Sequence, residues 1–310
     1  MVFNFTEGLI MDKINDKIFL TDITGIGDPF TLAYDGKYYI YATSASNGFR
    51  VFVTEDFVHV EDKGLCFTDC TWGVSHFWAP EVIYYKGKFI MHYTSCATKE
   101  EGLRMSTAVA DSPLGPFVDI SDKPVFDFGW PSIDGTAFID DDGQGYFYFS
   151  RDCSRNIIDG KHVSQIYGVK LSPDMLRPVG EPVLISQPET EWEFKSGDWL
   201  WNEGPAMLKH DGKYYLSYSV NCYTSLYYSV CYSVSDSPLS GFVKAKENPI
   251  LKYIDGVMSG PGHNSYFKTF DGQLMTSFHI HSDYEKRGGN RRICFAKAFF
   301  KDGKLVIDYE

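Results

Sequence analysis

Alternating apolar and polar residues on either side of a short polar turn recur five times along the chain. The fullest copy spans 201–219, where the turn HDG separates WNEGPAMLK from KYYLSYS. The other four copies are centred on Gly36, Gly87, Gly143 and Gly272. Asp-Gly or Lys-Gly between alternating apolar runs is the strongest short-range hairpin signal in a sequence. Each copy therefore predicts two antiparallel strands joined by a tight turn.

The spacing of these hairpins predicts the architecture. The turn glycines lie 51, 56, 69 and 60 residues apart, a period that suits a four-stranded propeller blade. A further apolar strand with a turn-rich end follows each hairpin, and two of these segments read ADSPLGPF (110–117) and SDSPLSGF (235–242). Together they make about twenty strands, so we expect an all-β, five-bladed β-propeller. The alternative is a β-sandwich with chance internal similarity.

The repeat runs through all 310 residues without a Pro/Gly/Ser-rich linker, which predicts one domain over 1–310. The net charge of −12 and the lack of a Lys/Arg-rich run argue against nucleic acid or an anionic membrane as a partner. No apolar run approaches the ~20 residues that cross a bilayer. The N-terminal stretch does not read as a secretory signal, so a cytoplasmic location is expected. Seven cysteines without a CxxC pair suggest reduced thiols.

Polar residues recur at one position of each predicted inner strand, where they would converge on the channel of a propeller. Nine residues before the turn glycine stand Asp134, Glu203 and His263, and eight before Gly36 stands Asp28. The second copy has Trp78 at this place. Three carboxylates and an imidazole at one channel mouth would suit proton-transfer chemistry. Asp before Pro or Gly is also a common turn residue, which is the competing interpretation of each acid alone.

Five short segments around these positions resemble the signature segments of glycoside hydrolase family 43. They are GDPF at 27–30, WAPE at 78–81, SIDGTAF at 132–138, NEGP at 202–205 and GHNS at 262–265. The resemblance implies a five-bladed propeller that hydrolyses arabinose- or xylose-containing glycosides with inversion and without an organic cofactor. It assigns Asp28 as general base, Glu203 as general acid and Asp134 as the residue that raises the pKa of the acid. These roles agree with the two-carboxylate chemistry of inverting hydrolysis.

The same resemblance places further residues around the sugar. His263 would lie on the propeller axis, where it would bind the substrate or Asp134, or stand beside a calcium or sodium ion. Of Arg291 and Arg292, strand alternation lets only one face inward, and we expect Arg292 to be the one that binds substrate hydroxyls. Trp78, and with it Phe30 and Ile133, would line the pocket for the terminal sugar.

The longest insertion between blades, PETEWEFKSGDWLWN at 188–202, is expected to form one wall of the cleft. It holds Trp192, Trp199 and Trp201, which together with Trp72 and Trp130 are candidates for leaving-sugar subsites. Each of them has a core position as its competing interpretation, because tryptophan in a β-protein is more often buried.

The expected activity is that of an exo-acting α-L-arabinofuranosidase on short plant cell-wall oligosaccharides. A β-xylosidase is the nearest alternative; the chain ends at Glu310 without the C-terminal β-sandwich of some family β-xylosidases, which favours the arabinofuranosidase. An endo-1,5-α-L-arabinanase is a third possibility. Remoter alternatives are a retaining fructan-type hydrolase, whose Asn-Asp-Pro-Asn-Gly segment is replaced here by GDPF, and a non-catalytic sugar-binding propeller.

Overall fold

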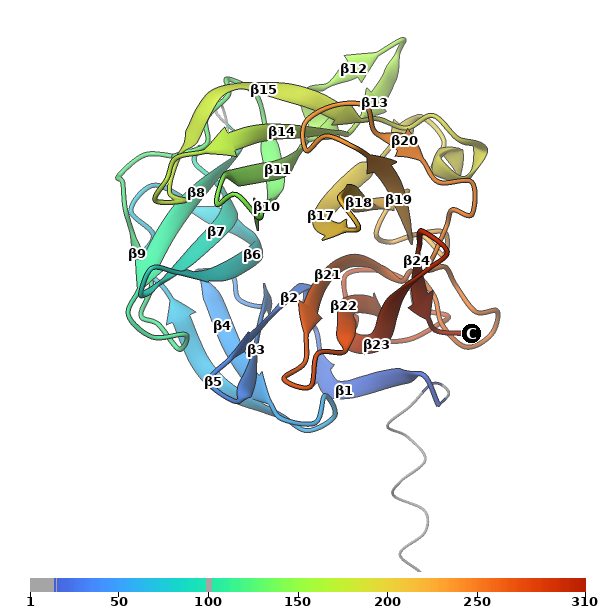
Figure 1. The fold of residues 1–310 in the computed structure, drawn as a ribbon, viewed down its shortest axis with the longest axis horizontal. Coiled ribbons are helices and arrows are strands. Elements are labelled where there is room, and N and C mark those ends of the chain that lie inside the picture. The colour runs from blue at the N-terminus through green and yellow to red at the C-terminus, as the bar shows by residue number, and fades with distance from the viewer. Residues whose placement is uncertain (1–13, 15, 99–101) are drawn as a thin grey trace, which may run out of the picture.

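The computed structural model describes residues 14, 16–98 and 102–310. Five antiparallel sheets stand around a common axis like the blades of a propeller (Figure 1). Their innermost strands are β2 (Gly27–Tyr34), β6 (Ser75–Tyr85), β10 (Ser132–Ile139), β17 (Asn202–His210) and β21 (Gly262–Lys268). Each of these strands contacts the inner strands of both neighbouring blades. The predicted five-bladed propeller is therefore confirmed, while residues 1–13 of the predicted domain lie outside the described residues.

The outer strands follow each inner strand in chain order. Blade one adds β3 (Lys37–Thr43), β4 (Phe49–Thr54) and β5 (Val60–Phe67), and blade two adds β7 (Lys88–Cys96), β8 (Leu103–Ala110) and β9 (Val118–Asp119). Blade three adds β11 (Gly145–Arg151), β14 (Gln165–Leu171) and β15 (Pro178–Ser186), and blade four adds β18 (Lys213–Val220), β19 (Ser229–Ser235) and β20 (Val243–Lys244). The period read from the turn glycines thus corresponds to one four-stranded blade.

Blade five joins the two ends of the described chain. It consists of β21, β22 (Leu274–His281) and β23 (Arg291–Lys301), and the long β23 pairs along one part with β1 (Ile18–Thr24) and along the other with β24 (Lys304–Asp308). An N-terminal strand in the last blade closes the ring by backbone hydrogen bonds, which leaves fewer unpaired edges.

In every blade, the pairing of the inner strand with the next strand shifts register at an equivalent position. The ladder shifts between Gly27 and Phe30 in blade one, and equivalent shifts occur in the other four inner strands. At each shift one residue has a left-handed backbone: Asp28 (φ 57°), Ala79 (43°), Asp134 (59°), Gly204 (53°) and His263 (48°). A β-bulge of this kind re-aims side chains locally. The bulges set which side chains reach the channel.

The observed register corrects the alignment of the polar residues that was obtained by counting back from the turn glycines. The turns of blades one, two and four have two residues, whereas the Asp140 amide donates to the Gln144 carbonyl across a three-residue turn, and blade five repeats this. Counting from the turn glycine therefore slips by one residue between blades. Asp28, Asp134 and His263 are structurally equivalent, and Glu203 instead shares its position with Trp78 and Ile133.

Five hydrophobic clusters fill the spaces between neighbouring blades. The cluster between blades one and two, for example, packs Tyr41 and Phe49 against Val82 and Met91. The aromatic-rich, alternating strands supply this packing because one face of every sheet meets the next blade. Each blade is thus stabilised mainly by its neighbours.

A small three-stranded sheet lies outside the blades. It contains β12 (Ile157–Ile158), β13 (Lys161–Val163) and β16 (Trp199–Leu200), flanked by the 3₁₀ turns η1 (Cys153–Arg155) and η2 (Glu191–Phe194). The pair β13 and β16 is parallel, with His162 opposite Trp199. The predicted insertion at 188–202 therefore contributes η2 and β16, and β16 completes a small sheet with two strands from residues 157–163.

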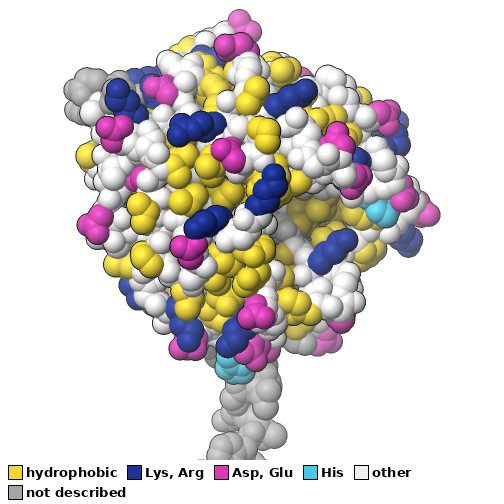
Figure 2. Space-filling view, turned by 60° about the vertical axis from the view of Figure 1, so that its left-hand side comes forward, with side chains coloured by type: hydrophobic (Ala, Val, Ile, Leu, Met, Phe, Trp, Pro, Cys, Tyr) yellow, Lys and Arg dark blue, Asp and Glu magenta, His cyan; other side chains and the backbone are white. Residues whose placement is uncertain are grey.

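The surface shows no gathering of one charge on the face drawn in Figure 2, where basic side chains alternate with acidic and apolar ones. Within the described ranges, no helix has the length and apolar character needed to cross a bilayer. All seven cysteines are described and are free thiols, as predicted.

The closing strand β1 generates a stability prediction. Ile18 is fully buried in the cluster between blades four and five, and Ile→Ala in a core costs about 2–5 kcal/mol of unfolding free energy. We expect Ile18→Ala to lower the urea midpoint accordingly. Val243→Ala is the control, since Val243 is 71% exposed and such surface changes stay within about 0.5 kcal/mol. Equal midpoints for the two variants would show that β1 does not hold the ring closed.

Candidate active site

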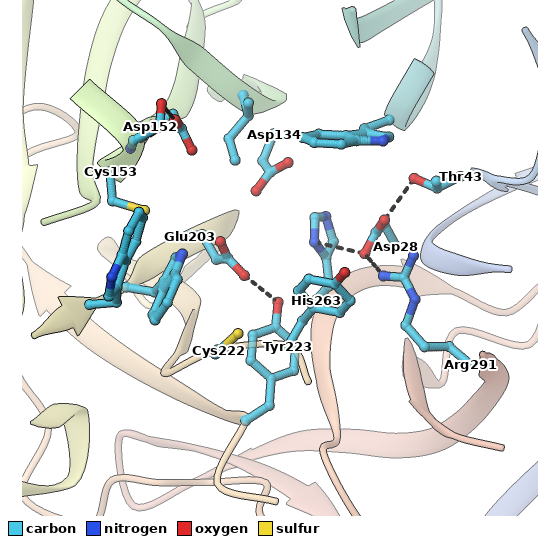
Figure 3. A pocket seen from close by; sticks show the side chains of 16 residues that line it. Asp28, Thr43, Asp134, Asp152, Cys153, Glu203, Cys222, Tyr223, His263 and Arg291 are labelled. Atoms are coloured by element: carbon cyan, nitrogen blue, oxygen red, sulfur yellow. Dashed lines mark hydrogen bonds and ion pairs between the residues drawn. The ribbon is translucent and has the colours of Figure 1, made fainter. Parts of the chain in front are cut away.

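A cavity of about 320 Å³ opens on the propeller axis. Every inner strand contributes to its lining: Asp28 from β2, Trp78 from β6, Ile133 and Asp134 from β10, Glu203 from β17 and His263 from β21. Figure 3 shows Asp28, Asp134 and Glu203 on three sides of this cavity, with His263 between the first and the last. The bulge on each inner strand has turned these side chains towards a common space.

Asp28 is held as a carboxylate. Its Oδ1 accepts a hydrogen bond from Nη1 of Arg291 at 2.6 Å, and its Oδ2 accepts one from the Thr43 hydroxyl at 2.6 Å. The Nδ1 of His263 lies 3.3 Å from Oδ1. Burial opposes the charge, but the charges of Arg291 and His263 hold the pKa of Asp28 well below its usual range. Asp28 is therefore ionised at neutral pH.

The approach of Arg291 requires glycine at position 27. A Cβ there would lie 2.1 Å from Cζ of Arg291, so the guanidinium lies directly over the Gly27 backbone. The glycine before Asp28 in GDPF thus has a packing reason. The ion pair Asp28–Arg291 joins β2 to β23, and so blade one to blade five.

The pKa values of Glu203 and Asp134 are raised, in contrast to that of Asp28. Burial, with Asp28 adding to it, raises the pKa of Asp134 to about 6, although His263 opposes this rise. Burial, and then the charge of Asp134, raises the pKa of Glu203 well above its ordinary value. Asp134 Oδ2 accepts a hydrogen bond from the Gly204 amide at 3.2 Å, which fixes it beside the backbone of Glu203. These surroundings favour the protonated form of Glu203 over the ionised form.

Tyr228 orients the carboxyl group of Glu203. Its hydroxyl donates to Glu203 Oε1 at 2.9 Å, and its ring stacks on His279 with centroids 5.5 Å apart. A Cβ on Gly262 would lie 2.2 Å from this ring, so glycine at 262 makes room for Tyr228. No motif in the sequence pointed to Tyr228, because its segment LYYSV reads as an ordinary strand.

The structure places most, but not all, of the predicted sugar-binding residues at the cavity. Trp78, Ile133, His263 and Arg291 line the cavity. Phe30 does not belong to this lining; it packs against the core cluster between blades one and two, because it lies two residues beyond the bulge at Asp28. The expectation for Phe30 was wrong.

The preference for Arg292 over Arg291 was also wrong. Arg292 directs its Nε to the carbonyl of Thr21 on β1, whereas Arg291 reaches Asp28. Strand alternation predicted that only one of the pair faces inward, and that part is confirmed. The missing information was the pairing of β23 with β1, which brings the Thr21 carbonyl within reach of Arg292.

Of the other tryptophans, Trp199 and Trp201 line the cavity. Trp72 donates to the Tyr93 hydroxyl inside the core, Trp130 packs on Phe149, and Trp192 packs in the cluster between blades three and four. The lining also includes residues that sequence reasoning did not identify, namely Thr43, Asp152, Cys153, Ser154, Cys222, Tyr223 and Tyr228.

Glu81, the last residue of WAPE, is buried but is not part of the lining. Burial raises the pKa of Glu81 to about 8, and the nearby charge of Asp134 contributes to this rise. Its Oε2 has no hydrogen-bond partner among the described residues. Glu81 is therefore mostly neutral at pH 7.

The side chains around His263 show whether protein groups could hold the predicted metal ion there. Among the described residues, no three His, Cys, Asp or Glu side chains are grouped to hold an ion. The carboxylate nearest to His263 Nδ1 is that of Asp28, which is already neutralised by Arg291. The described protein groups alone do not form a cation site here; calcium or sodium at this place stays a prediction.

The arrangement can donate a proton from one carboxyl group and accept one at another. The pKa of Glu203 is raised and that of Asp28 is lowered, and the two groups lie on different sides of one cavity. Such a pair supports acid–base cleavage of a bond placed between them.

Comparisons with known proteins agree with this chemistry. The model of the family "Glycosyl hydrolases family 43" matches residues 24–305. A solved thermostable family-43 glycoside hydrolase superposes with a TM-score of 0.90 at 44% identity, covering 93% of this chain and 94% of that one. The β-D-galactofuranosidase xynD of Aspergillus niger is 27% identical over 90% of this chain and 81% of its own length. The xylosidase/arabinosidase 43A of Humicola insolens is 29% identical, covering 91% of this chain and 96% of its own.

The coupling of Glu203 to its neighbours can be tested by titration. Asp134→Asn removes a negative charge, so the pKa of Glu203 should fall. Tyr228→Phe removes a hydrogen bond that favours the ionised carboxylate, so the pKa should rise. The measurement is ¹³C NMR of glutamate-labelled protein, with the Glu203 signal assigned from Glu203→Gln. Asp141→Asn, at an exposed turn, serves as control. An unchanged Glu203 titration in Asp134→Asn would contradict the assignment.

Proposed function

Because the chain belongs to glycoside hydrolase family 43 and is a glycosidase, we propose that it cleaves arabinofuranosyl or xylosyl linkages with inversion, chiefly as an exo-acting α-L-arabinofuranosidase. One observation carries the proposal: the same cavity holds Asp28, paired with Arg291, and Glu203, whose burial beside Asp134 raises its pKa. The names of the relatives, which include xylosidase/arabinosidase and α-L-arabinofuranosidase, support the choice of sugars.

Glu203 acts as the general acid. Its proton passes to the glycosidic oxygen as the bond to the anomeric carbon breaks, so that the leaving sugar departs as a neutral alcohol. Tyr228 orients the carboxyl group, and the charge of Asp134 keeps the proton on Glu203 near neutral pH. Activity should therefore fall as the pH rises through the pKa of Glu203, because the acid is then lost.

Asp28 acts as the general base on the opposite side. It accepts a proton from a water molecule, whose oxygen attacks the anomeric carbon. The ion pair with Arg291 lowers the basicity of Asp28 but fixes its orientation. Arg291 has one buried donor, Nε, without a partner in the described part of the chain, and an unpaired buried donor of this kind suits a substrate hydroxyl.

The size of the cavity supports action on chain ends. About 320 Å³ is at the small end of ligand pockets, which suits one terminal sugar. Trp78 and Ile133 supply apolar lining, and Asp28, Asp134 and Arg291 supply polar groups for hydroxyls. A β-xylosidase is the second candidate, because the terminal xylose has a similar hydroxyl pattern and relatives are named for both sugars.

The deciding experiment compares 4-nitrophenyl α-L-arabinofuranoside with 4-nitrophenyl β-D-xylopyranoside. Nitrophenol release mainly from the first supports the arabinofuranosidase. Release mainly from the second moves the assignment to a β-xylosidase. Failure on both, together with cleavage of linear arabinan, would identify an endo-arabinanase.

Two isosteric variants test the catalytic pair. Glu203→Gln and Asp28→Asn should each lower kcat by at least ~10²-fold, because each removes one proton-transfer group. Asp141→Asn is the control and should keep full activity. Circular dichroism checks that the variants are folded. Near-normal kcat in either folded variant would refute its assignment.

The stereochemistry of the product is a separate prediction. With Asp28 activating water opposite to the leaving group, the first anomer formed has the inverted configuration. Proton NMR during early turnover distinguishes it before mutarotation. Initial release of the retained anomer would instead require one carboxylate to act as a nucleophile.

A further inference from the structure

A second cavity, of about 550 Å³, adjoins the active-site cavity. Its lining includes Asp152, which also lines the active-site cavity, together with Trp130 and the arginines Arg104, Arg151 and Arg155. We propose that this second cavity, the arginine pocket, binds the carboxylate of an acidic sugar unit, such as a uronic acid, in the leaving part of the substrate. The assignment to the leaving part rests on the proposed function.

The arginine pocket concentrates positive charge on an acidic protein. The chain has a net charge of −12 and only eight arginines, and three of these eight line this one cavity. Among the described lining residues Asp152 is the only acid. A further acid, Asp127, accepts a hydrogen bond from Nε of Arg104 at 2.7 Å and offsets the charge of that arginine. Positive charge still exceeds negative charge among these described groups, which suits an anionic ligand.

Arg151 has the geometry to bind a carboxylate. Its guanidinium lies over the ring of Trp130, with Cζ 5.1 Å from the ring centroid, and it forms no ion pair with any acid of the described ranges. Trp130 is itself packed against Phe149 and Tyr167, with ring centroids 5.8 and 5.1 Å away. The guanidinium is thus held in place before a ligand arrives, and its parallel N–H donors match the two oxygens of a carboxylate.

Neighbouring parts of blades two and three bring the three arginines together. Arg104 lies near the start of β8, opposite Ser95 of β7, and Arg151 ends β11, opposite Ser132 of β10. The strands β8 and β10 are in contact. Arg155 ends the 3₁₀ turn η1, which follows β11. Arg104 is buried, Arg151 is half-buried and Arg155 is exposed, so a ligand that enters from solvent meets Arg155 and Arg151.

Asp152 connects the arginine pocket to the active site. It lines both cavities, and its Oδ1 accepts a hydrogen bond from the Ser154 amide at 2.9 Å. Figure 3 shows Asp152 on the side of Asp134 and Glu203, away from Asp28. The general acid protonates the oxygen that leaves with the aglycone. A sugar chain that extends from this oxygen past Asp152 therefore leads to the arginine pocket.

The size and the position of the pocket favour an acidic sugar over a small free anion. Its volume of about 550 Å³ exceeds the 320 Å³ of the active-site cavity, which leaves room for a whole sugar unit. A carboxylate that belongs to a bound oligosaccharide also has a high effective concentration at a neighbouring site. A free anion lacks this advantage.

The test compares the binding of two sugars that differ only in charge. Calorimetry on Glu203→Gln, in which turnover is expected to be slow, uses a xylotriose that carries one glucuronic acid and the same compound after reduction of its carboxylate to an alcohol. The acidic compound should bind at least ~10-fold more tightly in ~50 mM NaCl. The difference should shrink in ~500 mM NaCl because salt screens the charges. Equal affinities at low salt would overturn the proposal.

Arginine variants in the same background assign the preference to the pocket. Arg151→Gln and Arg155→Gln should each lower the affinity for the acidic compound ~5-fold or more and leave that for the neutral compound unchanged. Arg151→Lys keeps the charge without the planar fork and should lose less. Because Arg155 is exposed, Arg155→Gln tests the pocket even where Arg151→Gln disturbs the packing of Trp130.

Arg177→Gln is the matched control, because Arg177 is an exposed arginine of blade three that does not line the pocket. It should keep the preference for the acidic compound. An equal loss in Arg177→Gln, or a preference that survives in Arg151→Gln and Arg155→Gln, would refute the pocket.

The nitrophenyl glycosides, which carry no acidic unit, test the proposed function separately. No nitrophenol release by the wild type, with the charge preference intact, would refute the exo-activity and leave the arginine pocket in place. Nitrophenol release without a charge preference would refute the arginine pocket alone.

Discussion

The left-handed bulge on each inner strand is the constraint on which the site depends. A strand that continued in regular alternation would direct its side chains to the neighbouring blades, where the hydrophobic clusters lie. The break at Asp28, Asp134 and His263 turns three polar side chains towards the axis instead. Asp and His tolerate positive φ better than most residues, so the conformation and the chemistry select the same residue types.

The bulges also bring carboxyl groups with different surroundings into one small cavity. Asp28 has Arg291 and His263 beside it, while Glu203 has burial and the charge of Asp134. The pKa values of the two carboxyl groups are therefore driven apart by their neighbours rather than by residue type. Separated pKa values in a shared cavity are what acid–base catalysis at neutral pH requires.

Much of the architecture follows from local sequence signals. The relative register of the acidic residues does not. Asp-Gly and Lys-Gly turns between alternating strands determine hairpins through short-range geometry, so five blades could be predicted from their period. The acids Asp28, Asp134 and Glu203 could be recognised from their segments. Their relative register could not, because the turns at 141–143 and 270–272 are one residue longer than those at Asp35–Gly36 or Asp211–Gly212.

The sequence by itself determined the fold class, the number of blades, the three carboxyl groups and the aromatic insertion, since each is written in contiguous residues. The tertiary structure decided the contacts between distant segments. Arg291 rather than Arg292 reaches Asp28, and Arg292 instead binds the Thr21 carbonyl on β1. Phe30 enters the core, and Tyr228 reaches Glu203 past Gly262. Such contacts depend on packing between blades, which no local pattern of apolar and polar residues encodes.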